Sequence, residues 1–199
     1  MEKLKIDIEY YKESLVLAET EIETIHNTGK ALKDVIGIAY EKHRERIWKY
    51  FGFEVSKEKN DAMFDIDWCI KYKGELIAFE EDKGHYIDSC FLERALCGFS
   101  KTVNIYIKKN KKIPLFILHS FTKYNKYIMK LEQDIDTRKS EISDILQNKL
   151  IYTTLVNCDR LSKKKWFSKD YYKAYTDNAN EELIIKDIKF IQSLIPVSE

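Results

Sequence analysis

The feature that most restricts the fold is a strict alternation of apolar and polar residues that begins near residue 62. Apolar side chains occupy every second position on one side of an extended chain: Phe64, Ile66, Trp68 and Ile70. The positions between them fall on the other side: Asp65, Asp67, Cys69 and Lys71. A turn at Lys73 and Gly74 leads into a second extended run, so residues 62–83 are predicted to form a β-hairpin.

The segments around this hairpin carry apolar residues at helical spacing. Residues 9–27 predict one helix, and a second is expected between a cap at Thr28 and a stop at Gly52. Residues 88–109 contain a β-prone stretch, but the three-and-four spacing of their apolar side chains favours a helix. The apolar run 115–118 follows Pro114 and predicts a central strand that is covered on both faces.

The remaining chain predicts a long polar helix over 122–148, a strand over 150–157 and a last helix over 180–194. The fold class expected is therefore α/β (α+β): a mixed central sheet flanked by helices, with extra C-terminal helices and a strand. At 199 residues with no Gly/Pro-rich linker, the chain is expected to form a single domain over 1–199.

The cysteines and the hydropathy pattern indicate the cellular compartment in which the chain is expected to function. Four cysteines are spaced too widely for paired zinc motifs and lie in apolar surroundings: Cys69, Cys90, Cys97 and Cys158. Reduced, buried thiols are typical of a reducing compartment, so a cytoplasmic location is expected. No apolar run resembles a signal peptide or approaches a membrane span, so no membrane partner is expected.

The net charge is only +1, but the charges are unevenly distributed along the chain. Residues 101–130 hold eight lysines and no Asp or Glu. A second basic segment joins cations to neighbouring aromatic residues: Arg160, Lys163, Lys164, Lys165, Trp166 and Phe167. Such a segment suits contact with DNA, and an ordinary solvated surface loop is the alternative.

The most unusual local feature is an apolar strand, 76–79, that ends in three acids and a lysine, Glu80-Glu81-Asp82-Lys83. The hairpin sets these acids opposite Asp65 and Asp67, and clustered like charges repel one another unless a cation lies between them. Oxygen ligands without Cys or His suit a hard cation, so Mg²⁺ is expected, with Mn²⁺ as a substitute. An acid cluster with a bound cation and a lysine has the parts needed to hydrolyse a phosphodiester.

The order and spacing of these segments resemble the active-site hairpin of the PD-(D/E)xK nuclease superfamily. The resemblance is carried by Phe64-Asp65-Ile66-Asp67, the turn at Gly74, and Ile77-Ala78-Phe79-Glu80-Glu81-Asp82-Lys83. The family's acid, any residue, lysine triplet matches Glu81-Asp82-Lys83. The proline that usually precedes the first acid is replaced by Phe64, so either Asp65 or Asp67 could be the leading metal ligand.

Two further points follow from the resemblance. Strict alternation puts Glu81 and Lys83 on one face and Glu80 on the other, but a bulge near the strand end could turn Glu80 toward the metal instead. In these nucleases the helix before the hairpin often lends a glutamate to the site, and Glu41 matches that position.

The resemblance implies a restriction-endonuclease-like core over about residues 30–120, in the order helix, three strands, helix, strand, with 121–199 added for DNA recognition or dimerisation. The catalytic residues it implies are Asp67, Glu81, Lys83 and Glu41, and the candidate metal ligands are Asp65, Asp67, Glu80 and Glu81. The expected DNA-binding residues are Arg160, Lys163, Lys164 and Lys165. The activity implied is Mg²⁺-dependent cleavage of double-stranded DNA, most simply by a type II restriction endonuclease acting as a homodimer. The alternatives are a structure-specific junction or repair nuclease, and a non-catalytic DNA-binding module on the same fold.

Overall fold

The structure is a computed structural model that describes residues 2–26, 28–29, 32–57, 66–83, 89–123, 144–157 and 181–196. The described helices are α1 (Glu2–His26), α2 (Leu32–Tyr50), α3 (Ser89–Lys108), α5 (Asp144–Lys149) and α7 (Glu181–Ser193). The described strands are β1 (Glu54–Ser56), β2 (Trp68–Tyr72), β3 (Glu75–Lys83), β4 (Leu115–Lys123) and β5 (Leu150–Asn157).

The strands form one mixed sheet in the order β1-β2-β3-β4-β5. β1, β2 and β3 form an antiparallel meander, and β3, β4 and β5 run parallel to one another. A parallel neighbour cannot be reached by a tight turn, so the chain crosses from β3 to β4 through α3. β3 is therefore the strand at which the antiparallel half of the sheet meets the parallel half.

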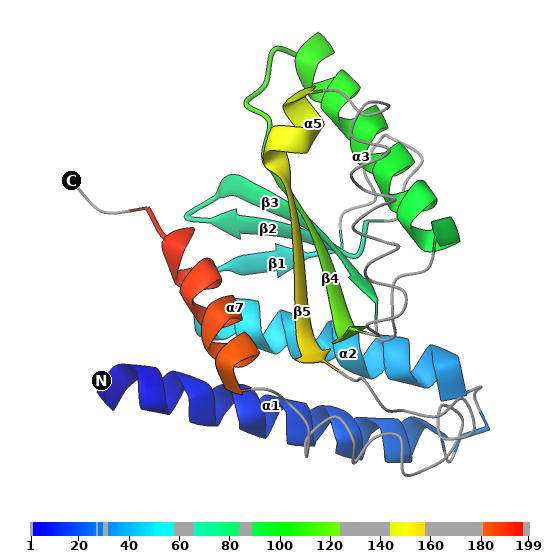
Figure 1. The fold of residues 1–199 in the computed structure, drawn as a ribbon, viewed down its shortest axis with the longest axis vertical. Helices are drawn as coiled ribbons and strands as arrows, with labels where there is room; N and C mark the ends of the chain where they lie inside the picture. The colour runs from blue at the N-terminus through cyan, green and yellow to red at the C-terminus, as the bar shows by residue number, and fades with distance from the viewer. Residues whose placement is uncertain are drawn as a thin grey trace.

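Helices cover both faces of the sheet, as Figure 1 shows. α1, α2 and α7 pack on the face that carries Trp68, Ile70, Ala78 and Ile117. α3 and α5 pack on the opposite face, which carries Cys69, Phe79, Phe116 and Leu118. Within the described residues, no helix is both long enough and apolar enough to cross a membrane.

Several sequence-based expectations are confirmed. The hairpin forms with its turn at Lys73 and Gly74, which both take positive φ. The helix predicted over 88–109 is α3, and the run predicted as a covered strand lies in β4, between β3 and β5, with Phe116 and Leu118 fully buried. The order helix, three strands, helix, strand expected for residues 30–120 is that of α2 to β4.

The stop predicted at Gly52 is also found. α2 ends at Tyr50, and Gly52 has a φ of 85°, which a residue with a side chain rarely adopts. The N–H of Gly52 donates to the carbonyl of Lys49 at 3.0 Å, and that of Phe53 donates to Trp48 at 3.1 Å. This closure turns the chain from α2 directly into β1.

Three expectations need correction. The first helix starts at Glu2, well before residue 9. Ile66 packs with Cys69 and not with Trp68, because the chain bends at Asp67 and breaks the alternation there. Thr122 and Lys123, expected to open a long helix, instead finish β4, whose parallel pairing with β5 continues to that point. The rest of that expected helix, 124–143, lies outside the described residues.

Candidate active site

The start of β2 and the end of β3 bring two carboxylates together. The antiparallel register pairs Trp68 with Glu80, so one step further it sets Asp67 opposite Glu81. An Asp67 carboxylate oxygen accepts the backbone N–H of Asp82 at 2.8 Å. The Glu81 carboxylate accepts the backbone N–H of Asp67 in return. These reciprocal hydrogen bonds fix the two acidic residues side by side on neighbouring strands.

Two further residues complete the group expected from the sequence. Glu41, on α2, lies near enough for its charge to act on both Asp67 and Glu81. Lys83 follows Glu81 on the same face of β3, and its charge also acts on Glu81. The Lys83 ammonium lies 4.6 Å from the ring centroid of Phe91 at the start of α3. The structure thus brings Glu41, Asp67, Glu81 and Lys83 into one place.

The two central carboxyl groups are held in surroundings that oppose ionisation. Burial raises the pKa of Asp67 to about 7, and the negative charge of Glu41 contributes. Burial also raises the pKa of Glu81 to about 8, with the charge of Asp67 as the next cause. A bound cation would reverse both effects, because it favours the ionised form of each group.

These shifts predict a metal-dependent pH profile of stability. Both carboxyls bind protons more tightly in the folded chain than at their ordinary values of 3.8 and 4.5. Their contribution to stability is therefore complete below about pH 4 and is lost as the pH rises through about 7 to 8. A divalent cation binds the ionised pair, so we expect Mg²⁺ to raise the melting temperature more at about pH 8 than at about pH 6.

Thermal melts in Mg²⁺ and in chelator, repeated across this range, measure the difference. Subtracting the melting temperature in chelator from that in Mg²⁺ cancels the contribution of groups whose titration does not depend on the metal. His43 and His119, whose pKa values burial lowers, are two such groups. The variant Asp67→Asn/Glu81→Gln serves as the control and should show no dependence of the Mg²⁺ effect on pH. A wild-type Mg²⁺ effect that is flat or decreases with pH would contradict the assignment.

Glu80 is not placed with these carboxylates, which corrects its inclusion among the candidate metal ligands. Its side chain is fully buried on the opposite face, toward α2. Arg44 donates to both Glu80 oxygens, at 2.8 and 3.0 Å, and the Trp48 indole N–H donates at 3.0 Å. The irregularity in the hairpin falls between Ile70 and Lys71, opposite the part of β3 before Ala78, so the strict alternation holds from Ala78 to the end of β3.

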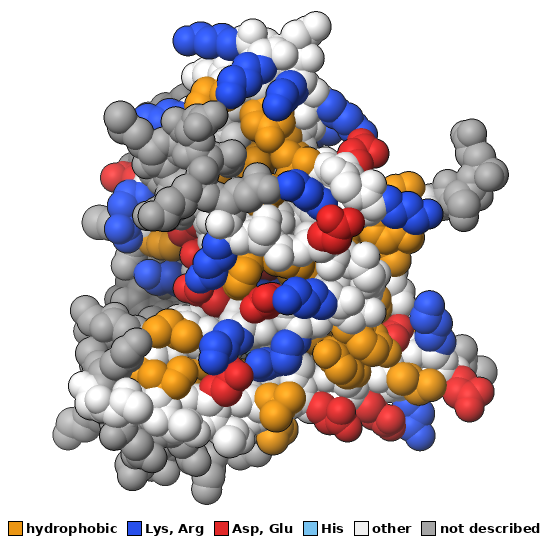
Figure 2. Space-filling view, turned by 180° about the vertical axis from the view of Figure 1, so that it is seen from behind, with side chains coloured by type: hydrophobic (Ala, Val, Ile, Leu, Met, Phe, Trp, Pro, Cys, Tyr) orange, Lys and Arg blue, Asp and Glu red, His pale blue; other side chains and the backbone are white. Residues whose placement is uncertain are grey.

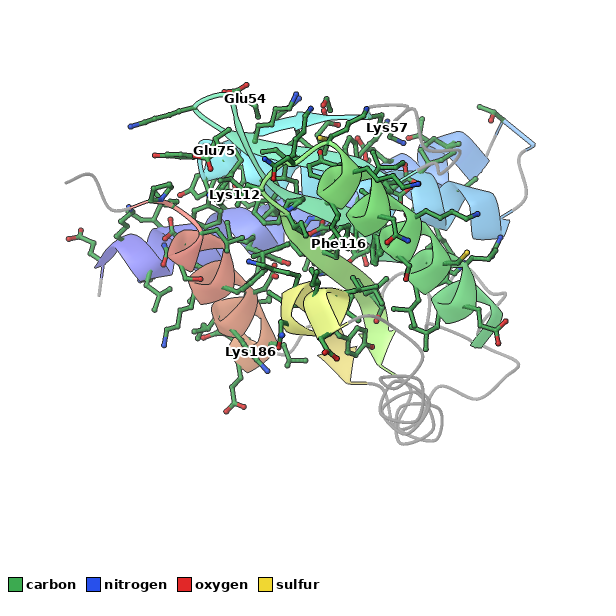
Figure 3. All side chains as sticks on the ribbon, turned by 90° about the horizontal axis from the view of Figure 1, so that it is seen from above. Glu54, Lys57, Glu75, Lys112, Phe116 and Lys186 are labelled. Atoms are coloured by element: carbon green, nitrogen blue, oxygen red, sulfur yellow. The ribbon has the colours of Figure 1, made fainter. Side chains whose placement is uncertain are left out.

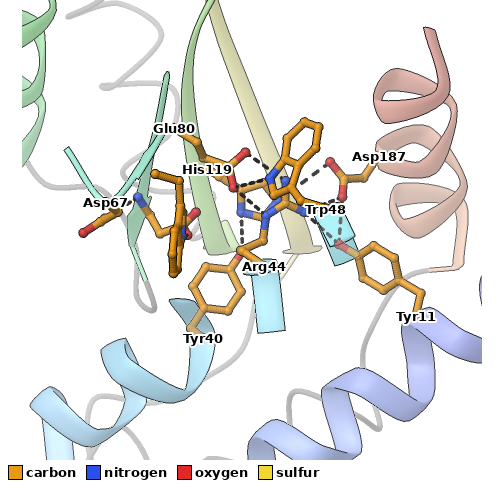
Figure 4. A network of polar contacts seen from close by, with 10 residues as sticks. Tyr11, Tyr40, Arg44, Trp48, Asp67, Glu80, His119 and Asp187 are labelled. Carbon is orange, nitrogen blue, oxygen red and sulfur yellow. Dashed lines mark hydrogen bonds and ion pairs between the residues drawn. The ribbon is translucent and has the colours of Figure 1, made fainter. Parts of the chain in front are cut away.

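Arg44 extends this buried cluster to the last described helix (Figure 4). It donates to an Asp187 oxygen on α7 at 2.6 Å, and Tyr11 on α1 donates to the same oxygen at 2.8 Å. All of these side chains are nearly or completely buried. The network ties three helices to β3 immediately beside Glu81, and among its members only Glu80 stands out in the sequence.

Asp82, the middle residue of the triplet, also faces away from Glu81. It is buried, and the Trp68 indole N–H donates to one of its oxygens at 2.8 Å. Burial raises the pKa of the Asp82 carboxyl well above its usual value, with the charge of Glu80 as the next cause. Asp82 therefore belongs to the packed face of β3, and Glu81 and Lys83 are the residues of the triplet on the other face.

Lys57 is a functional candidate that the sequence analysis missed. It follows β1 directly and forms an ion pair with Glu41. Its ammonium lies 5.0 Å from the centroid of the Trp68 ring, and its charge acts on Asp67. In the sequence it stands in the polar run 56–61, which gives no sign that it reaches the acids.

The donor set fits a hard cation. Asp67, Glu81 and Glu41 supply only carboxylate oxygens, the ligands that Mg²⁺ prefers. Among the described residues, no three His, Cys, Asp or Glu side chains are arranged to hold an ion as they stand. Glu41 is paired with Lys57. Asp65, the alternative leading acid, lies outside the described residues.

The structure does not describe the residues that the sequence predicts to bind DNA. Arg160, Lys163, Lys164 and Lys165 lie outside the described residues. Exposed lysines at the end of α3 and just beyond it form a basic group at the top of Figure 2: Lys108, Lys109, Lys111 and Lys112. Because Lys112 pairs with Glu75 at the start of β3, this group lies at the opposite end of that strand from Glu81.

Comparison of the chain with protein-family models, with curated proteins and with solved structures finds no match.

Proposed function

We propose that the chain is a metal-dependent endonuclease that hydrolyses DNA, with an active site of the PD-(D/E)xK kind. One observation carries the proposal: Asp67, immediately before β2, lies opposite Glu81 on β3, with Lys83 on the same face as Glu81 and Glu41 nearby. Structural ion pairs alone do not account for this arrangement, because burial and mutual repulsion disfavour ionisation of both central acids.

Each residue has a chemical part in this proposal. Asp67 and Glu81 would hold Mg²⁺ or Mn²⁺, and Glu41 would support a second ion. The bound cation supplies the positive charge that lowers the pKa of the attacking water and stabilises the charge developing on phosphorus. Lys83 adds a fixed positive charge on the side of the attacking water. The water would give up a proton to the solvent as its oxygen forms a bond to phosphorus and the bond to the leaving oxygen breaks, and the leaving oxygen would take up a proton from the solvent.

The arrangement of elements supports the same proposal. The core α2-β1-β2-β3-α3-β4 has the order expected for a restriction-endonuclease-like fold, and the site lies where β2 begins and β3 ends. The substrate we propose is double-stranded DNA, cut at a specific sequence as by a type II restriction endonuclease.

Cutting both strands at a symmetric sequence calls for two copies of the site, so we propose a homodimer. α1 carries exposed apolar side chains at Ile6, Val16 and Leu17, and Ile6 and Leu17 are about three helical turns apart. This is the described surface to test first, by measuring the mass of the protein in solution with and without substitutions there.

The experiment that tests the proposed function is digestion of mixed plasmid and phage DNA and of a branched DNA junction, with Mg²⁺ or with chelator. Discrete Mg²⁺-dependent bands from linear duplex would support sequence-specific cleavage. Cleavage confined to the junction would support a structure-specific nuclease on the same site. DNA that stays intact in every lane, while the protein still binds it, would favour a non-catalytic DNA-binding module.

A further inference from the structure

Lys57 lies at the edge of the acid cluster because of the register of the sheet. β1 pairs with β2 so that Ser56 is opposite Cys69, and one step further sets Lys57 opposite Trp68. Asp67 immediately precedes Trp68, so the side chain that follows β1 starts beside the carboxylates of the candidate active site. The pairing of β1 with β2 thus places a second lysine, besides Lys83, next to the carboxylates of the candidate active site.

The contacts of Lys57 differ from those of an ordinary surface lysine. Its ammonium donates to Glu41, while it lies over the Trp68 ring and within electrostatic reach of Asp67 and Asp82. The Lys57 side chain is 59% exposed, but that of its partner Glu41 is only 23% exposed. The Lys57 ammonium therefore interacts with acids from three places in the fold: α2, the start of β2 and the end of β3.

A second lysine–glutamate pair in the same chain shows how the Lys57–Glu41 pair differs from an exposed one. Lys112 also pairs with a glutamate, Glu75, at 2.7 Å, but at the other end of β3 (Figure 3). Both partners of that pair are mostly exposed, 81% and 56%. Exposed pairs of this kind contribute little to stability or to local charge balance. The Lys57 pair, by contrast, borders carboxyl groups that repel one another.

We propose that Lys57 is the counter-ion of the metal-free active site, and that binding of a divalent cation displaces its ammonium from Glu41. This inference rests on the proposed function, since it takes the acid cluster to be a metal site. An ammonium and a divalent cation held by the same carboxylate repel each other, so binding of the metal at Glu41 favours departure of the ammonium. Lysine suits the role, because it is a single point charge on a flexible four-carbon chain that can leave without moving the backbone.

Competition between Lys57 and a metal ion can be measured without DNA cleavage. If Lys57 competes with the metal, removing its charge should tighten metal binding, because the ion no longer has to displace a cation or sit beside one. If Lys57 instead held the Glu41 side chain in position to bind the metal, its loss would weaken metal binding, which is the opposite result.

The experiment uses Mn²⁺ alone as the probe and follows free Mn²⁺ by its electron paramagnetic resonance signal in a titration of the purified full chain. Lys57→Met removes the charge and keeps an apolar chain against the Trp68 ring. We expect its Mn²⁺ affinity to be on the order of tenfold higher than that of the wild type. Lys57→Arg keeps the charge and Lys112→Met removes a charge at the far end of β3, so both should bind Mn²⁺ like the wild type.

A second readout guards against a variant that folds poorly. Without metal, Lys57→Met should melt below the wild type, because the acids have lost their counter-ion, and saturating Mn²⁺ should remove most of that difference. Lys57→Gln should behave in the same way.

The outcomes separate this inference from the proposed function. Unchanged or weaker Mn²⁺ binding by Lys57→Met, with normal binding by the wild type, would overturn the role of Lys57 and leave the metal site standing. Absence of Mn²⁺ binding by the wild type and by every Lys57 variant would overturn the metal site and the inference together. Binding seen only when Lys57 is replaced would support the inference in its strongest form.

Discussion

Replacement of Lys83 by alanine is expected to lower the rate of DNA cleavage by about a thousandfold and to leave DNA binding close to that of the wild type. The reason is positional: Lys83 shares a face of β3 with Glu81, and its charge already acts on that carboxyl group. Loss of one fixed charge at the reacting phosphate removes stabilisation of the transition state, while affinity depends on many contacts along the DNA.

Single-turnover cleavage and a binding titration in Ca²⁺ would measure the two effects separately. Lys111→Ala is a suitable control, because Lys111 is exposed just beyond α3 and belongs to the basic group at the other end of the sheet. It should cleave at the wild-type rate. Full cleavage by Lys83→Ala would remove this residue from the active site.

The largest effect on stability is expected from Arg44→Met, which should lower the free energy of unfolding by about 3 to 5 kcal/mol. Arg44 is fully buried and holds Glu80 and Asp187, which are also buried, through charged hydrogen bonds. Without the guanidinium, two carboxylates would remain in the core with no compensating charge. Urea unfolding followed by circular dichroism would give the value.

Two variants make this prediction specific. Lys49→Met breaks an exposed pair with Glu45 on the same helix and should cost less than about 0.5 kcal/mol. Arg44→Met/Asp187→Asn should be more stable than Arg44→Met alone, because one of the two uncompensated carboxylates has been removed. A loss below about 1 kcal/mol for Arg44→Met would show that the buried network does not hold β3 as described.

Most of the secondary structure could be predicted because the signals are local. Alternation over 62–83 and the Lys73-Gly74 turn specify the hairpin, and three-and-four spacing specifies α3. The same alternation correctly separated Glu81 and Lys83 from Glu80, because β3 is regular from Ala78 to its end. The alternation gave no sign of the bend at Asp67. Asp67 occupies a polar position, so a bend there does not alter the spacing of the apolar residues in the sequence.

The network around Arg44 could not be predicted in the same way. Arg44 stands in a run of charged residues, 41–46, that is typical of a solvated helix face, yet its side chain is fully buried. Its partner Asp187 is 143 residues away, in a segment that sequence reasoning treated as an addition to the core. Lys57 was missed for a related reason: only the pairing of β1 with β2 reveals which acids it can reach.

The central claim is that the carboxylates of β2 and β3 hydrolyse DNA with a divalent metal. The most direct test compares wild type and Glu81→Gln, purified in parallel, for cleavage of phage DNA and of a branched junction in Mg²⁺ and in chelator. We expect the wild type to cut at least one of these substrates in Mg²⁺ only, and Glu81→Gln to cut neither. Equal cleavage by both proteins, or none by the wild type on any substrate, would contradict the claim.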